Sequence, residues 1–137
     1  MKHTLDIFDQ HVISCAYQAV ENVTGMSREQ ITHKLRVAKF VRARRIVMKL
    51  IRTHSNLSLE IIGQETGGKD HATILHNCKV HEDHYQTDRE YRELFQRCRS
   101  EFIYLLGTDK AKNMLEAVEF KIRDLLKERR KLKQAIL

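Results

Sequence analysis

The sequence predicts an all-α fold, and three observations carry that prediction. Proline is absent and glycine occurs only five times in 137 residues, which allows long uninterrupted helices and disfavours a turn-rich β fold. Apolar residues recur at helical spacing along nearly the whole chain. The 42% hydrophobic content lets a chain of this length bury a core without disulfides. We expect one helical domain over residues 1–106 and an amphipathic C-terminal helix over residues 107–137.

Three helices are predicted in the first part of the chain. An apolar stripe indicates a helix from about Leu5 to Val23, which Gly25 ends. A capping box that begins at Ser27 opens a short helix to about Leu35, and a third helix runs from about Val41 to His54. The stripe of the first helix comprises Ile7, Phe8, Val12, Ile13, Cys15, Ala16, Ala19, Val20 and Val23. The third helix has Ala43, Ile46, Val47, Leu50 and Ile51 on its inner face and Arg44, Arg45, Lys49 and Arg52 facing outward.

A helix-turn-helix is predicted in the middle of the chain. A short helix from about Ser58 to Glu65 precedes the pair Gly67–Gly68, and a second helix follows from about Asp70 to His84. The second helix opens with Asp70, His71 and Thr73, which are short polar residues that can reach a base edge or a phosphate. In a helix-turn-helix of this layout, the second helix enters the DNA major groove with its N-terminal residues.

The positive charge is concentrated in the same region. The chain has a formal net charge of +7. Residues 27–81 hold 11 lysines and arginines against 4 acidic residues, whereas the rest of the chain holds 14 of each. Clustered charge of this kind favours a polyanionic partner and salt-sensitive association. The alternative interpretation is a basic face that only keeps the protein soluble.

The end of the chain carries a heptad repeat. One helix is expected from about Asp88 to Leu106, a break at 107–109, and a final helix capped by Thr108 or Asp109. Leu115, Ile122, Arg129 and Ile136 occupy a positions, and Ala111, Val118, Leu125 and Leu132 occupy d positions. A strict period of 3.5 favours a two-stranded coiled coil and a homodimer, with dimerisation through Leu115, Val118, Ile122, Leu125, Arg129 and Leu132. In a parallel pair, Glu128 would face Lys133. The alternative is an amphipathic helix packed on its own domain.

Three linked motifs lie in order between about Leu5 and Tyr104. They are ARRIVMKL at 43–50, SLEIIG at 58–63 and GGKDHATILH at 67–76. In order and spacing they resemble the C-terminal DNA-binding domain of the bacterial replication initiator DnaA. The resemblance implies a Trp-repressor-like helix-turn-helix that binds double-stranded DNA at initiator-box-like sites. Such a chain is expected to regulate replication initiation or transcription.

The resemblance also implies roles for individual side chains. Arg36 lies where the family's arginine enters the minor groove, a position that suits a weakly hydrated, permanently charged group. The implied base contacts are Arg36, Asp70, His71 and Ala72, with the helix cap as the alternative role for Asp70. The implied phosphate contacts are Arg44, Arg45, Arg52, Lys69, Thr73 and His76. Ala72 replaces a family threonine, Lys69 a family arginine, and Glu60 a proline found in some members. We therefore expect the preferred site to differ from that of the family.

Catalysis and cofactors are not indicated. Residues 67–70 imitate the end of a phosphate-binding loop, but the upstream glycine is absent and Asp70 replaces the hydroxyl that would hold Mg²⁺. We expect no enzyme activity and no ATP hydrolysis or origin melting by this chain alone. A metal site among Cys78, His81 and Glu82 is a rival interpretation, but no second ligand pair stands at a recognised distance. No metal or small-molecule substrate is therefore expected.

The expected location is the bacterial cytoplasm, at the nucleoid, with a phage or mobile-element origin as a further possibility. Three widely spaced cysteines make no disulfide framework, and such cysteines are typical of a reducing compartment. The longest apolar run, 102–106, is too short to cross a membrane, and the first residues lack the apolar run of a signal peptide. The alternative function is a structural or protein-interaction role. A phage virion component or a replication accessory protein would keep the fold with weak or non-specific DNA binding.

Overall fold

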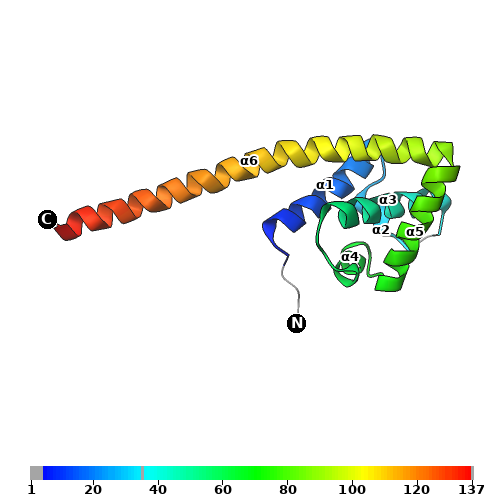
Figure 1. The fold of residues 1–137 in the computed structure, drawn as a ribbon, viewed down its shortest axis with the longest axis horizontal. Helices are drawn as coiled ribbons and strands as arrows, with labels where there is room; N and C mark the ends of the chain where they lie inside the picture. The colour runs from blue at the N-terminus through cyan, green and yellow to red at the C-terminus, as the bar shows by residue number, and fades with distance from the viewer. Residues whose placement is uncertain (1–4, 35, 137) are drawn as a thin grey trace. The chain divides into compact units, whose positions relative to one another are not determined.

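A computed structural model describes residues 5–34 and 36–136 of the chain (Figure 1). These residues form helices and no strand, so the all-α prediction is confirmed. The helices are α1 (Ile7–Thr24), α2 (Arg28–Thr32), α3 (Ala38–His54), α4 (Leu59–Glu65), α5 (His71–Thr87) and α6 (Arg89–Ile136). The chain forms two compact units, of which one ends at Leu106 and the other begins at Gly107. None of the helices in the described ranges combines the length and apolarity needed to cross a membrane.

Local capping signals set the bounds of the first helices. Asp6 caps α1 by accepting a 2.7 Å hydrogen bond from the Asp9 amide, and Gly25 ends it at a left-handed φ of 76°. The predicted capping box at Ser27 is confirmed, because Ser27 and Gln30 each accept a hydrogen bond from the other's backbone amide. The expected end of this helix at about Leu35 lies outside the described residues.

The predicted buried stripe of α1 is wrong at its start. Ile7 is 77% exposed and Phe8 is 44% exposed, whereas Tyr17, which the stripe omitted, is buried. The apolar period continues past the part of the helix that other helices cover, and periodicity alone does not show where that cover ends. The rest of the stripe lies in or against the core, with Val12, Ala16, Ala19 and Val20 fully buried.

Helix α3 lies at the centre of the N-terminal unit and packs against α1, α2, α4 and α5. Its predicted inner face is confirmed, since Ala43, Ile46, Val47, Leu50 and Ile51 are each at most 1% exposed. The prediction that Arg44 and Arg45 face outward is wrong, because both are buried. Four helices pack around α3, so more of its circumference is buried than the face that carries its apolar residues. The apolar stems of arginine side chains can occupy the additional buried positions.

The predicted break at Gly107 is also wrong. Helix α6 runs without interruption from Arg89 to Ile136, and Gly107 has a helical backbone inside it. Glycine in a helix interior costs only about 1 kcal/mol relative to alanine. The strong helix formers Leu105 and Leu106 before it, and the lysine- and alanine-containing segment from Lys110 after it, outweigh this cost. The first part of α6 contributes Tyr91, Phe95, Cys98 and Phe102 to the core of the N-terminal unit.

Candidate nucleic-acid interface

The turn between α4 and α5 depends on three glycines. Gly67 and Gly68 have φ values of 100° and 72°, a left-handed region in which glycine avoids the strain of a side chain. Gly63 is required for a different reason, because a Cβ built on it would lie 1.9 Å from the carbonyl oxygen of Lys69. The Lys69 amide donates a 2.8 Å hydrogen bond to the Gly63 carbonyl. The turn therefore packs directly on the backbone of α4.

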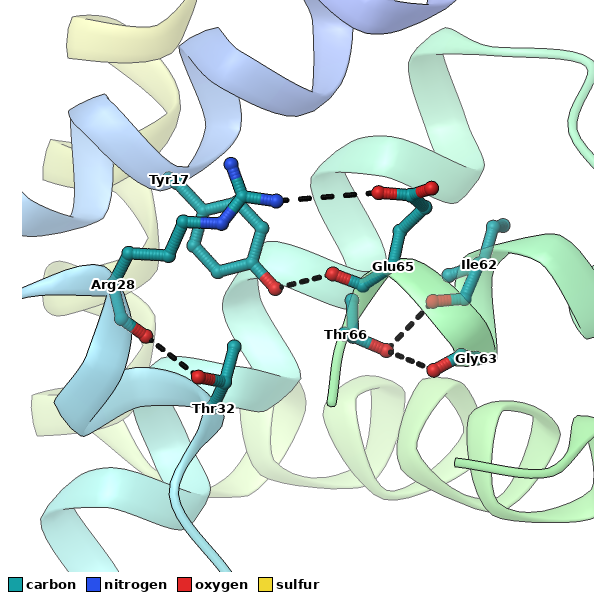
Figure 2. A network of polar contacts seen from close by, with 7 residues as sticks. All are labelled: Tyr17, Arg28, Thr32, Ile62, Gly63, Glu65 and Thr66. Carbon is teal, nitrogen blue, oxygen red and sulfur yellow. Dashed lines mark hydrogen bonds and ion pairs between the residues drawn. The ribbon is translucent and has the colours of Figure 1, made fainter. Parts of the chain in front are cut away.

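A polar network fixes the end of α4, where this turn begins (Figure 2). The Tyr17 hydroxyl of α1 donates a 2.8 Å hydrogen bond to the carbonyl of Glu65. The Arg28 guanidinium of α2 stacks 4.1 Å from the centre of the Tyr17 ring and lies 4.0 Å from the Glu65 carboxylate. The Thr66 hydroxyl closes the last turn with a 2.7 Å hydrogen bond to the Ile62 carbonyl. Helices α1 and α2 thus hold the helix-turn-helix in place.

Burial raises the pKa of Tyr17 to about 12, so this phenol stays a neutral donor. Sequence reasoning missed this role. The helical spacing could have indicated the burial of Tyr17, because Tyr17 follows Ile13 by four residues on the buried stripe of α1, but it does not indicate the contact with Glu65.

The first turn of α5 is capped and open to solvent. Asp70 is the N-cap, and its carboxylate accepts a 2.8 Å hydrogen bond from the Thr73 amide. This hydrogen bonding to Thr73 lowers the pKa of Asp70. The side chains of His71, Ala72 and His76 are exposed. The alternative role of Asp70 as the helix cap is thereby confirmed. The cap fixes the start of α5, and the exposed residues follow directly after it.

Arg45 and Asn77 join α3 to α5. The Arg45 Nε donates a 3.3 Å hydrogen bond to Asn77 Oδ1, and Asn77 Nδ2 donates a 2.9 Å hydrogen bond to the Thr73 carbonyl. Burial lowers the pKa of Arg45, although an arginine stays charged at neutral pH. Sequence reasoning missed Asn77, because its role depends on a side chain 32 residues away.

Arg44 holds the segment that follows α2. Its guanidinium donates hydrogen bonds to the carbonyl of His33 and, at 3.4 Å, to that of Ile31. Burial lowers the pKa of Arg44. Arg36 lies three residues beyond His33, in the connection to α3, and is exposed. Arg44 thus fixes the backbone at His33, three residues before the exposed Arg36.

The remaining predicted DNA contacts lie on three elements. Lys69 and Thr73 are half-buried at the turn and the first turn of α5, next to the exposed His71 and His76. Arg52 is exposed in the last turn of α3. The structure therefore brings the residues of the 67–76 motif together, and it places Arg36 and Arg52 on separate elements.

The rival metal site does not assemble. His81 is 2% exposed and its Nδ1 lies 2.6 Å from the Tyr91 hydroxyl, inside a cluster of aromatic rings. Glu82 instead forms a 2.7 Å ion pair with Lys49. Within the described ranges, no group of three histidine, cysteine, aspartate or glutamate side chains could hold a metal ion.

The tight glycine turn, the capped second helix and its exposed first turn define a helix-turn-helix domain. Residues 14–80 match a family model described as "Bacterial dnaA protein helix-turn-helix". The predicted resemblance to the DNA-binding domain of this family is confirmed for these residues.

Several curated relatives carry the printed name "Chromosomal replication initiator protein DnaA". The protein of Porphyromonas gingivalis is 36% identical over 85 residues, which cover 62% of this chain and 18% of that protein. That of Lactobacillus johnsonii is 39% identical over 80 residues, covering 58% and 18%. That of Bacteroides fragilis is 41% identical over 59 residues, covering 43% and 12%. The chain thus spans less than a fifth of the length of these relatives. No solved structure matches.

Proposed function

We propose that this chain binds double-stranded DNA sequence-specifically, with α5 in the major groove and Arg36 in the adjacent minor groove. One observation carries the proposal. The first turn of α5 presents exposed side chains from a helix start that is fixed by the Asp70 cap and by the packing of the turn on Gly63. A recognition helix needs this rigidity, because base readout depends on side chains placed within hydrogen-bond range of base edges.

The proposed base contacts follow from the chemistry of the exposed residues. His71 can donate to a purine acceptor, and the Ala72 methyl can pack on a thymine methyl. Asp70 combines its capping role with acceptance from a cytosine amino group. Arg36 suits a narrow A·T-rich minor groove, where the negative potential is enhanced.

The proposed phosphate contacts divide into two groups. Arg52, Lys69, Thr73 and His76 reach the surface and position the protein without reading the sequence. Arg44 and Arg45 are buried, and we assign their main contribution to holding the connection to Arg36 and the α5 helix. Any phosphate contact by these two arginines is secondary to that support.

In the cell, we propose that this DNA binding occupies initiator-box-like sites and regulates replication initiation or transcription. The match of residues 14–80 to the family model supports this proposal, as does the clustering of the net charge in residues 27–81. The proposed location is the bacterial nucleoid, where such sites lie. The proposal assigns DNA binding, and no catalytic step, to these 137 residues.

Fluorescence anisotropy tests the proposal on two duplexes of equal length, one with an initiator box and one with the same bases scrambled. We expect tighter binding to the box duplex at physiological salt, with both affinities falling as salt rises. Selection from random duplexes would then define the preferred site. Equal affinity for both duplexes, together with no enriched sequence in the selection, would reject specific recognition. That result would favour the structural or protein-interaction role.

A further inference from the structure

The C-terminal unit carries an apolar stripe whose described side chains are exposed. The stripe consists of the apolar a and d residues of the heptad repeat. Its large members are between 52% and 84% exposed: Leu115, Val118, Ile122, Leu125, Leu132 and Ile136. A stripe of this length on a helical surface, interrupted at Arg129, marks an interaction site, because single exposed apolar residues are ordinary and an aligned row of them is not. The 3.5-residue period fits a second helix as the occupant.

The charges decide which helix fits, and in which direction. In a parallel pair of identical helices, equal positions meet in the same core layer. The two copies of Arg129, an a position, would then share one layer. Lys121, at g, would face the partner's Leu126, and the favourable g–e pair would be Glu128 with the partner's Lys133. A shared layer of two arginines opposes this arrangement.

An antiparallel pair removes that conflict. A two-fold axis between residues 123 and 124 pairs each a residue with a d residue of the partner. The layers are then Ile122 with the partner's Leu125, Leu115 with the partner's Leu132, and Val118 with the partner's Arg129. The two copies of Arg129 lie about 16 Å apart along the axis at the helical rise of 1.5 Å per residue. This separation exceeds the screening length of about 8 Å at physiological salt.

The flanking charges also favour the antiparallel pair. Its g positions face each other, so Lys121 meets the partner's Glu128, and symmetry repeats this pair. Glu119, at e, lies at the level of the partner's Arg129 and can neutralise it. An unfavourable pair, Lys112 with the partner's Lys133, is confined to the two ends of the paired segment, where exposure to water weakens it.

We propose that residues 111–136 of α6 form an antiparallel two-stranded coiled coil with the same segment of a second copy of this chain. The apolar a and d residues supply the affinity, and the Lys121–Glu128 pairs set the direction. This inference does not depend on the DNA-binding proposal, because it uses only residues of the C-terminal unit.

Charge exchange in the full chain tests both the pairing and its direction. The variants are K121E, E128K and the double variant K121E/E128K. The control is K127E, which makes the same charge change at an f position that faces away from the partner helix. Sedimentation equilibrium at low salt measures the dissociation constant, and circular dichroism checks that helicity is retained.

The wild type should sediment as a dimer of the 16.2 kDa chain. K121E and E128K should each weaken the dimer by roughly tenfold, because each places like charges across two symmetric contacts. The double variant should restore it, and K127E should leave it nearly unchanged. A parallel pair predicts a different pattern, with no effect of K121E and no rescue of E128K, and that pattern would overturn the proposed direction.

A Leu125→Glu variant tests whether copies associate through the proposed coiled coil or through another surface. It should sediment as a monomer while keeping the melting transition of the N-terminal unit. A Leu125→Glu protein that stays dimeric would overturn the proposal. A wild-type chain that stays monomeric at the highest soluble concentration would also overturn the proposal. The same holds if that monomer binds anionic lipid vesicles, because the apolar stripe would then have a membrane surface as its partner.

Discussion

Arg45 donates a hydrogen bond from Nε to Oδ1 of Asn77, 3.3 Å away, and this contact joins the central helix α3 to α5, the second helix of the helix-turn-helix. Asn77 also donates a hydrogen bond to the Thr73 carbonyl, so the Arg45 guanidinium is linked through Asn77 to the first turn of α5. A buried arginine of this kind contributes to folding, and in the proposed function its charge also adds to the attraction of DNA. Its counterpart at the surface is Arg52, which is exposed.

Replacing Arg45 and Arg52 by methionine should separate these two contributions. Both variants lose one positive charge, and both keep an unbranched apolar stem. Arg45→Met should lower the free energy of unfolding by about 1–3 kcal/mol, because it leaves Asn77 without its donor. Arg52→Met should leave unfolding within about 0.5 kcal/mol of the wild type and reduce the salt slope of DNA binding by about one. Urea unfolding and salt-dependent anisotropy measure the two effects. Equal unfolding free energies would contradict the structural role of Arg45.

His71 and His76 offer a matched test of base readout against phosphate contact. Both histidines are exposed on α5, so substitution by alanine should have little effect on folding. His71→Ala should reduce the preference for the selected site over random DNA by about 1–3 kcal/mol, the range for one base contact. His76→Ala should weaken binding to both DNAs alike. Competition anisotropy checks this, and identical losses of preference in the two variants would show that the assigned roles are wrong.

Gly63 and Gly68 should respond differently to alanine, although both belong to the helix-turn-helix. A Cβ on Gly63 would lie 1.9 Å from a backbone oxygen, which cannot move without displacing the turn. Gly63→Ala should therefore cost about 3 kcal/mol or more and weaken DNA binding as well. A Cβ on Gly68 meets no atom within 4 Å, so Gly68→Ala should cost about 1–2 kcal/mol for its left-handed backbone alone. Urea unfolding of both variants tests the order, and a larger loss in Gly68→Ala would refute the packing argument.

Structural features that depend on interactions between residues close in sequence could be predicted. The cap at Ser27 is predictable because a capping side chain bonds an amide only three residues away. The turn at Gly67–Gly68 was likewise identified, since a left-handed backbone strongly favours glycine. These local signals were enough to locate the helix-turn-helix and the exposed residues of its second helix.

Features that depend on distant neighbours could not be predicted in this way. The burial of Arg44 depends on carbonyls 11 and 13 residues earlier in the chain. The Tyr17 contact to Glu65 spans 48 residues, and no local pattern indicates it. Helix α6 continues through Gly107 because the helix propensity of the rest of the segment outweighs the free-energy cost of one glycine, a sum that no single residue reveals. The sequence identified the elements of the site, whereas their supports emerged only from the fold.

His81 should make the stability of the N-terminal unit sensitive to mild acid. It is 2% exposed, and burial, with Lys49, Arg45 and His84 nearby, lowers its pKa to about 4, while Glu82 opposes the shift. Its Nδ1 lies 2.6 Å from the Tyr91 hydroxyl. Burial raises the pKa of Tyr91, so the phenol stays protonated and can donate to neutral His81. The unfolded chain binds a proton at His81 near pH 6.5, before the folded chain does.

This difference fixes the sign of the pH effect. The stability that neutral His81 contributes is fully present above about pH 6.5, and it is lost progressively as the pH falls toward 4, to a total of about 3 kcal/mol. Urea unfolding of the wild type and of His81→Gln between pH 7 and 5 measures it, because carboxylates contribute little in that range. His81→Gln should show a flatter dependence on pH, even though its stability at pH 7 is lower. His54→Gln is the matched control, since burial also lowers the pKa of His54 but less strongly. A pH dependence in His81→Gln as steep as in the wild type would show that another group is responsible.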